Sequence, residues 1–302
     1  MLHTVTKPKP PVLVWWALTL FFFLVLLVRG SGLSLAAYDA LLFSAKRLIP
    51  SLFPFAVVAK VVASLPISSR SAHIPLLHLP LSALPALFLG LISGYPMGAI
   101  AAKGLYDNGK LSRKSAEVLS ATFNNASLAF LLFTVSPLFS NTRLGAVLFI
   151  SQTLASLTVA VFVFPKESRS SLPDCDTHNA RFFEILGSAV TKAAEAMLTL
   201  TAFVTFFAIL AEMLATVSPL RAIYPTLLLL LEPTAALRYL ASSPTALTLP
   251  LAAFTLGFSG LSVLLQSLAV WNFEISLQKS LLIRLFIGIL SALFSLFFQK
   301  IL

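Results

Sequence analysis

The feature that most constrains this chain is a set of long stretches without any Asp, Glu, Lys or Arg. These stretches cover residues 10–28, 71–102, 118–142, 144–165, 196–211 and 239–273. An α-helix needs about 20 mostly apolar residues to cross the hydrocarbon core of a bilayer. The period-two alternation that would indicate a β-barrel is absent. The chain is therefore predicted to be an all-α polytopic membrane protein.

The composition supports a surface that faces lipid. Hydrophobic residues make up 58% of the chain and charged residues 11%, whereas an ordinary soluble domain carries about 25% charged residues. The net charge of +10 comes mostly from bases in short loops, as the positive-inside rule describes. We therefore expect the lipid bilayer, and no nucleic acid, as the partner of these bases.

No catalytic or metal-binding pattern is present. Cys175 is the only cysteine, and the four histidines are scattered along the chain. There is no Gly-x-Ser-x-Gly elbow and no glycine-rich phosphate loop ending in Lys. We expect no enzyme activity, no metal and no cofactor, with Na⁺ or H⁺ open as a coupling ion.

The chain is predicted to have four parts. Residues 166–181 form a hydrophilic linker near the middle of the chain. A first membrane span precedes the first repeat. It is expected to be retained, because its apolar run ends at Arg29 and not at a signal-peptide cleavage site. The parts are an N-terminal transmembrane helix at 1–33, a first repeat at 34–165, the linker, and a second repeat at 182–302.

Charge counting predicts that the two repeats are inverted. If Lys7 and Lys9 keep the N-terminus in the cytoplasm, three crossings separate the starts of the repeats. Residues 34–47 are expected to lie in the membrane interface as an amphipathic helix, and residues 118–135 to form one span. Opposite orientation of two halves is the pattern of many secondary transporters.

Two hydrophobic stretches are interrupted by small residues. The first carries Ser93-Gly94-Tyr95-Pro96, and the second carries Ser259-Gly260-Leu261-Ser262. Proline and glycine weaken a helix, and free backbone groups in lipid cost several kcal/mol each. Each break must therefore be buried in protein or line a wet cavity, where half-helix ends can face a bound solute. Close packing of small residues is the alternative.

Two further polar segments lie in apolar surroundings. Asn124-Asn125 and Ser127 either contact partners or a solute, or cap a helix at the interface. Glu232 and Thr234 follow a run of leucines, where a carboxylate needs a partner, a proton or an ion, unless it lies at headgroup level. Gln266 lies one turn beyond the second break.

These motifs, in this order, resemble the YlbJ/SpoVV family of sporulation integral membrane proteins, which carry the nucleoside-recognition Gate domain. The resemblance covers roughly residues 35–300. Ile100, Leu128 and Pro233 depart from the family pattern. The resemblance implies a fold like that of concentrative nucleoside transporters, with two inverted repeats whose re-entrant or broken helices meet at mid-membrane. It also implies transport of dipicolinate or a similar solute, and homo-oligomers occur in this architecture.

The leading hypothesis is a secondary transporter or facilitator of a small anionic, dipicolinate-like carboxylate or a nucleoside-like solute in the bacterial cytoplasmic membrane. A non-transporting Gate-fold scaffold or sensor in sporulation or envelope assembly is the alternative, and a membrane enzyme is disfavoured. The predicted substrate-binding residues converge on one cavity: Ser93, Gly94, Tyr95, Pro96, Asn124, Asn125, Ser127, Glu232, Thr234, Ser259, Gly260, Ser262 and Gln266.

Overall fold

A computed structural model describes residues 12–64, 73–74, 79–80, 83–107, 109–165, 182–216 and 222–299. Its regular elements are helices, apart from one antiparallel pair of two-residue strands, β1 (His73–Ile74) and β2 (Leu79–Pro80). The predicted linker at 166–181 lies outside the described residues. The all-helical architecture expected from the uncharged stretches is thus confirmed.

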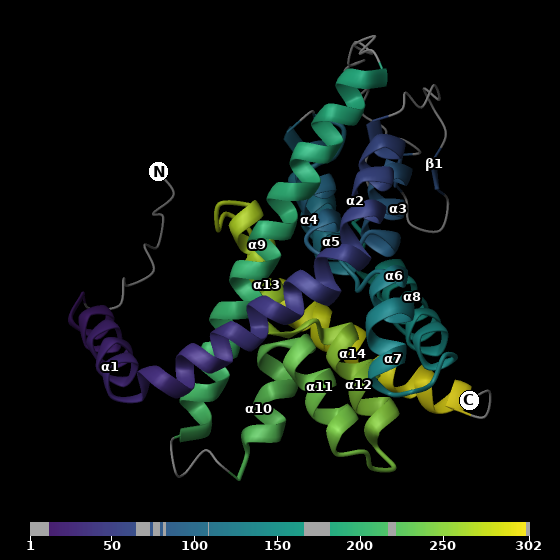
Figure 1. Ribbon diagram of the computed structural model, residues 1–302. Helices are drawn as coiled ribbons and strands as arrows, with labels where there is room; N and C mark the ends of the chain where they lie inside the picture. The colour runs from purple at the N-terminus through teal and green to yellow at the C-terminus, as the bar shows by residue number, and fades with distance from the viewer. Residues whose placement is uncertain are drawn as a thin grey trace, which may run out of the picture.

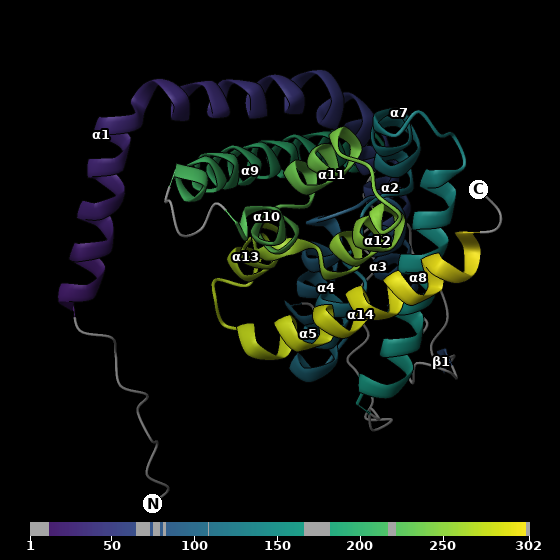
Figure 2. The same ribbon diagram turned by 90° about the horizontal axis from the view of Figure 1, so that it is seen from below.

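The N-terminal part is one bent helical run. Helix α1 (Val12–Phe43) changes direction at Arg29, whose backbone has φ −114° and ψ 18°. A π-helical turn, η1 (Ser44–Leu48), joins it to α2 (Ile49–Ser64). Figure 2 shows the two arms of α1 meeting at a bend, with the second arm alongside α9. The first arm also contacts α9, because the Phe22 ring stacks on the Phe206 ring with centroids 6.1 Å apart. The residues expected to form a separate interfacial helix at 34–47 instead continue this run.

Four apolar segments are broken into shorter helices. The first two breaks separate α3 (Leu84–Ile92) from α4 (Met97–Asp107), and α5 (Arg113–Thr122) from α6 (Leu128–Phe130). The other two separate α10 (Tyr224–Leu231) from α11 (Pro233–Ser242), and α12 (Thr248–Phe258) from α13 (Gly260–Val270). After α6 the chain continues as a π-helical turn, η3 (Leu131–Val135), and α7 (Ser136–Leu138). The single span expected at 118–135 is wrong, because residues 123–127 leave the helix.

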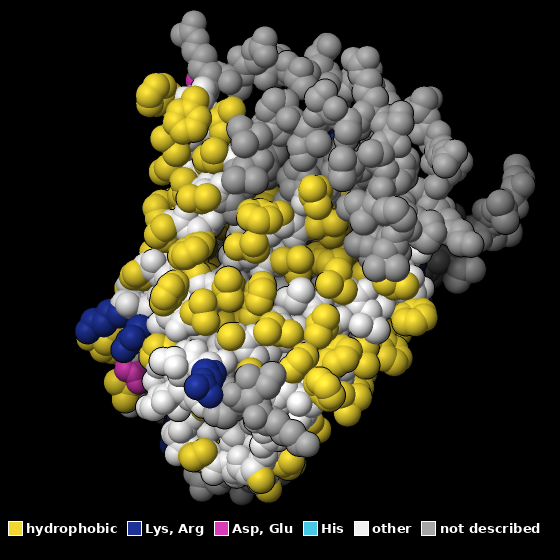
Figure 3. Space-filling model, turned by 90° about the vertical axis from the view of Figure 1, so that its right-hand side faces the viewer, with side chains coloured by type: hydrophobic (Ala, Val, Ile, Leu, Met, Phe, Trp, Pro, Cys, Tyr) yellow, Lys and Arg dark blue, Asp and Glu magenta, His cyan; other side chains and the backbone are white. Residues whose placement is uncertain are grey.

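Unbroken helices complete the structure: α8 (Leu144–Val163), α9 (Phe182–Thr216) and α14 (Leu277–Phe298). Among the described residues, five helical runs are long and apolar enough to span a membrane, namely Thr19–Val58, Leu144–Val163, Phe182–Ala215, Thr248–Val270 and Leu277–Phe298. Figure 3 shows apolar side chains over much of the described part of one face, with few charged ones. These findings indicate a multi-pass membrane protein.

The two halves present their breaks in the same order. In the first half, α2 is followed by the α3/α4 break, the α5/α6 break and then α8 (Figure 1). In the second half, α9 is followed by the α10/α11 break, the α12/α13 break and then α14. In element order, Tyr95-Pro96 in the first half therefore corresponds to Glu232-Pro233 in the second half.

The interior is closed by tight helix packing around α12, α14 and α8. A Cβ added to Gly257 would lie 2.9 Å from the Cα of Gly288, so the backbones of α12 and α14 touch at these glycines. Close approach through small residues is a usual way for helices to associate in membranes. This packing brings the α12/α13 break against the segment that follows α5.

Candidate functional site

All four breaks meet in the centre of the molecule. The Asn125 amide donates to the Gly90 carbonyl at 3.1 Å, which joins the first two breaks. A Cβ on Gly260 would lie 2.9 Å from the Leu231 carbonyl oxygen, so the last two breaks also touch. Asn124 Nδ2 donates to Ser267 Oγ at 2.9 Å and ties the second break to α13. The four segments therefore lie against one another in the fold.

The first break needs glycine for two separate reasons. Gly94 has φ +82°, a left-handed conformation that side chains disfavour, and a Cβ there would lie 3.0 Å from the Ser127 Cβ. Gly90 and Gly98 both lie against the Phe123 carbonyl, with added Cβ atoms only 1.6 and 2.2 Å from its oxygen. The Tyr95-Pro96 peptide bond is cis. These glycines let the turn after α3 nest against the end of α5.

A buried cavity lies where the breaks meet. The cavity has a volume of about 20 Å³, enough for about one water molecule. Apolar side chains from α2, α9 and neighbouring elements form much of its wall. The polar or glycine residues that line it are Gly94, Tyr95, Ser127, Glu232, Thr234 and Gln266, all of them predicted site residues.

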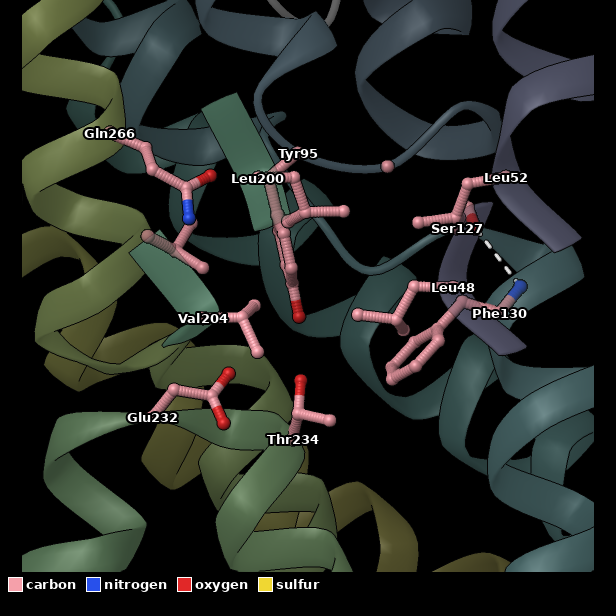
Figure 4. Close-up of a pocket in the computed structure, with 12 residues that line it drawn as sticks. Leu48, Leu52, Tyr95, Ser127, Phe130, Leu200, Val204, Glu232, Thr234 and Gln266 are labelled. Carbon is pink, nitrogen blue, oxygen red and sulfur yellow. Dashed lines mark hydrogen bonds between the residues drawn. The ribbon is translucent and has the colours of Figure 1, made fainter. Parts of the chain in front are cut away.

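The polar groups of this cavity come from different breaks and point toward one another. In Figure 4 the Tyr95 hydroxyl faces Glu232 and Thr234, while the Gln266 amide approaches from another side. The Tyr95 hydroxyl and both polar atoms of the Gln266 amide are buried and have no hydrogen-bond partner among the described residues. Buried polar groups normally have partners. We call Tyr95, Glu232, Thr234 and Gln266 the cavity face.

Glu232 has a structural role in addition to facing the cavity. It is the N-cap of α11, and its Oε2 accepts from the Ala235 amide at 2.5 Å. A carboxylate is favoured at the positive end of a helix, and Pro233 at the first helical position has no amide hydrogen to satisfy. Glu232 is only 2% exposed, so protein surrounds its carboxylate.

Behind the cavity, a fully buried network is organised by Arg284 of α14. Its guanidinium donates to Asn125 Oδ1 at 3.0 Å, to the Gly257 carbonyl at 3.4 Å and to the Asn124 carbonyl. Asn125 Nδ2 also donates to Ser156 Oγ at 2.9 Å. We call Asn124, Asn125, Ser156, Ser267 and Arg284 the rear network. It fixes the second break and the end of α12 to the same side chain.

The predicted residues therefore divide between two roles. Six of them line the cavity, as given above, and the other seven do not. Asn124 and Asn125 belong to the rear network, and they do not cap α6, because Ser127 Oγ accepts from the Phe130 amide instead. Ser259 is left-handed with φ 70° and links α12 to α13. Those outside the cavity lining are Ser93, Pro96, Asn124, Asn125, Ser259, Gly260 and Ser262.

Sequence reasoning missed Arg284 as a member of the site. A lone arginine in an apolar helix can reach for the interface, but Arg284 is 2% exposed. A signal was present, because Arg284, Gly288, Ser291 and Ser295 follow one another at three- and four-residue spacing and are all buried on α14. A polar and small stripe along an apolar helix predicts contact with protein and not with lipid.

Comparison of the chain with protein-family models, with curated proteins and with solved structures found no match. The resemblance to the YlbJ/SpoVV family therefore rests on the motifs themselves. Among the residues that the structure describes, no group of three or more His, Cys, Asp or Glu side chains could hold a metal ion. The arrangement of the cavity face is suited to binding by hydrogen bonds.

Proposed function

We propose that this protein is a secondary transporter or facilitator that binds a small polar solute between its four breaks. The observation that carries the proposal is the cavity face, where Tyr95 and Gln266 from opposite halves of the chain keep buried polar atoms without partners among the described residues. Such atoms lower the stability of the fold by about 1–3 kcal/mol each. A solute that completes their hydrogen bonds accounts for their presence.

The lining favours a neutral, nucleoside-like solute over a dianion such as dipicolinate. The only charged type of side chain in the lining is the carboxylate of Glu232, and no Lys or Arg lines the cavity. Helix N-termini can attract anions, but those of α11 and α6 are already capped by Glu232 and Ser127. An amide, a phenol and a hydroxyl together match the mixed donors and acceptors of a nucleobase or sugar.

Binding of such a solute requires the cavity to open. Ligand sites commonly have volumes of about 300–1,000 Å³, whereas the volume of this cavity is about 20 Å³. Leu200 and Val204 of α9 and Leu48 and Leu52 close the cavity with apolar side chains. Apolar side chains can move apart without breaking hydrogen bonds. We therefore assign these contacts to the closed state of the transporter.

Glu232 is our candidate for the coupling residue. A buried carboxylate in a membrane protein can carry a proton or hold a cation such as Na⁺. We expect Glu232→Gln to keep solute binding but to abolish the dependence of uptake on the ion gradient. Uptake by Glu232→Gln proteoliposomes that still follows a proton or Na⁺ gradient would assign the coupling to another residue.

The finer architecture belongs to the same proposal. The common order of the breaks supports two repeats, and we propose that they are inverted and that the protein lies in a bacterial cytoplasmic membrane with a cytoplasmic N-terminus. Reporter fusions after Lys9 and within 166–181 should both be cytoplasmic. A reporter found outside at either position would contradict this orientation.

The decisive experiment is uptake by proteoliposomes of a panel of radiolabelled nucleosides and small carboxylates, with and without Gln266→Leu. Wild-type protein should take up at least one nucleoside-like solute, and Gln266→Leu should reduce uptake at least about tenfold. The reason is that losing a hydrogen bond to solute at a cost of about 1.4 kcal/mol weakens binding by a factor of ten. Uptake of dipicolinate alone would correct the solute class. Folded protein without uptake of any solute would favour the scaffold or sensor.

A further inference from the structure

A second, larger space opens next to the cavity. This groove lies between α1, α9, α10 and α11. Its volume is about 720 Å³, compared with about 20 Å³ for the cavity. Its volume falls within the range of about 300–1,000 Å³ that is usual for ligand sites. In Figure 2 the second arm of α1 runs alongside α9 and α11, the helices that form the groove walls.

The groove and the cavity follow one another along the same face of α9. Leu200 and Val204 line the cavity, and Ala208, Ala211 and Glu212 line the groove. Residues three or four positions apart lie on one face of a helix. The face of α9 that closes the cavity therefore continues, one turn later, as the wall of the groove.

Two other elements show the same succession. On α11, Thr234 lines the cavity, and Arg238, one turn further, lines the groove. At the N-terminal side, Leu48 lines the cavity and Asp39 the groove. Three elements thus run from one space to the other, which makes the groove an approach to the cavity and not an unrelated surface hollow.

One side-chain contact joins α1 to α11 at positions that lie close in the chain to lining residues of both spaces. The Arg238 guanidinium stacks over the Phe43 ring, with its Cζ 5.4 Å from the ring centroid. Phe43 ends α1 and lies between Asp39 and Leu48 in the chain, while Arg238 is one turn beyond Thr234. A cation–π contact of this kind is weak enough to open, at about 0.5–1 kcal/mol where exposed.

The charges on the groove wall indicate that it holds water and not lipid chains. Asp39, Glu212 and Arg238 line it, and among the described residues no ion pair joins any of them to another. Charged side chains at membrane depth face water or a partner because hydrocarbon does not solvate them. Two carboxylates against one guanidinium also give the wall an acidic balance, which disfavours anions.

We propose that this groove is the aqueous entrance to the cavity, that the contact between Phe43 and Arg238 is its gate, and that it admits neutral or cationic polar solutes in preference to dianions. This inference rests on the proposed transport function, because an entrance has a use only if the cavity receives a solute. It adds a route, a gate and a charge preference that the cavity alone does not supply.

The test is the reactivity of single cysteines in open membrane fragments, where reagents reach both faces. Cys175 is first replaced by Ser, and a cysteine is then placed at Ala211 in the groove or at Leu293, an exposed apolar position on α14. A water-soluble cationic methanethiosulfonate should label Ala211→Cys at least about tenfold faster than Leu293→Cys, because thiols ionise poorly in apolar surroundings. An anionic reagent should be slower than the cationic one, after each rate is normalised to a free thiol.

The gate is tested with a cysteine at Val204 in the cavity wall. Phe43→Ala, and separately Arg238→Gln in case the first variant fails to fold, should raise the labelling rate of Val204→Cys at least about tenfold, as expected when a weak contact that blocks the path is removed. Phe297→Ala, an exposed apolar change on α14, should leave that rate unchanged.

Three outcomes would overturn the inference. Labelling of Ala211→Cys only by a lipid-soluble maleimide would mean that lipid fills the groove. Labelling of Ala211→Cys without any effect of the gate variants on Val204→Cys would mean that the groove leads elsewhere. Preference of the groove for the anionic reagent would contradict the charge selectivity. Labelling needs no transported solute, so a failed uptake panel with the expected labelling would reject the transport function and not the aqueous path.

Discussion

The cavity face and the rear network are both buried and polar, yet the polar groups at their centres differ in hydrogen bonding. In the rear network, the Arg284 guanidinium donates to three oxygens from two breaks. In the cavity face, the Tyr95 hydroxyl and the Gln266 amide have no partner among the described residues. A partnered buried group stabilises a fold, whereas an unpartnered one destabilises it. The contrast separates residues that position the breaks from residues available to a solute.

The largest expected effect is on the packing that supports both regions. Gly90→Ala would place a Cβ 1.6 Å from the Phe123 carbonyl oxygen, and a clash with backbone should lower the unfolding free energy by about 4 kcal/mol or prevent folding. Gly104→Ala on α4, where a Cβ would meet nothing within 4 Å, should be neutral or stabilise by up to about 1 kcal/mol. Chemical unfolding in detergent measures both changes, and equal stabilities would contradict the close approach of α3 to Phe123.

The next effect tests the rear network directly. Arg284→Gln removes a buried guanidinium and leaves carbonyl oxygens of both halves unpaired, which should cost about 3 kcal/mol of unfolding free energy. Arg284→Lys should recover only part, since an ammonium lacks the planar fork that reaches several oxygens at once. Arg47→Gln, at an exposed position, should change stability by less than about 0.5 kcal/mol. If Arg284→Gln were as harmless as Arg47→Gln, the network would have no positioning role.

A pair of matched glutamine substitutions compares the two regions more closely. Gln152 Nε2 donates to the Ala126 carbonyl at 2.7 Å, so Gln152→Leu should lose about 1 kcal/mol of unfolding free energy. Gln266→Leu replaces an amide without described partners by an apolar group of similar length, and should hold or raise stability. The same unfolding experiment gives both values. Destabilisation by both substitutions to the same degree would show that Gln266 is a structural residue.

The smallest structural effect is expected at Tyr95. Tyr95→Phe removes only the unpartnered hydroxyl, so the unfolding free energy should hold or rise by about 1 kcal/mol, while the KM for uptake should rise about tenfold through loss of one hydrogen bond to solute. Tyr38→Phe, at an exposed position on α1, should change neither value. An unchanged KM for Tyr95→Phe would remove the hydroxyl from the binding site and weaken the assignment of the cavity face.

The elements differ in how far the sequence predicts them. The uncharged stretch at 144–165 predicted α8 well, because length and apolarity alone make a spanning helix. Residues 118–135 satisfied the same criteria but fold as separate short elements, since Asn124 and Asn125 leave the helix to meet Ser267, Ser156 and Arg284. Local apolarity cannot report that distant partners are available to satisfy a broken backbone.

The sequence by itself determined that the chain is helical, that it is suited to a membrane, and that the two segments around Ser93-Gly94-Tyr95-Pro96 and Ser259-Gly260-Leu261-Ser262 would be interrupted. Those properties depend on composition and on the conformational limits of Gly and Pro, which are local. Tertiary structure decided which interruptions face the cavity and which are bonded behind it, and it moved Arg284 from the interface to the centre. The reason is that hydrogen bonding and burial are set by neighbours more than 100 residues away, as between Asn125 and Arg284, 159 positions apart.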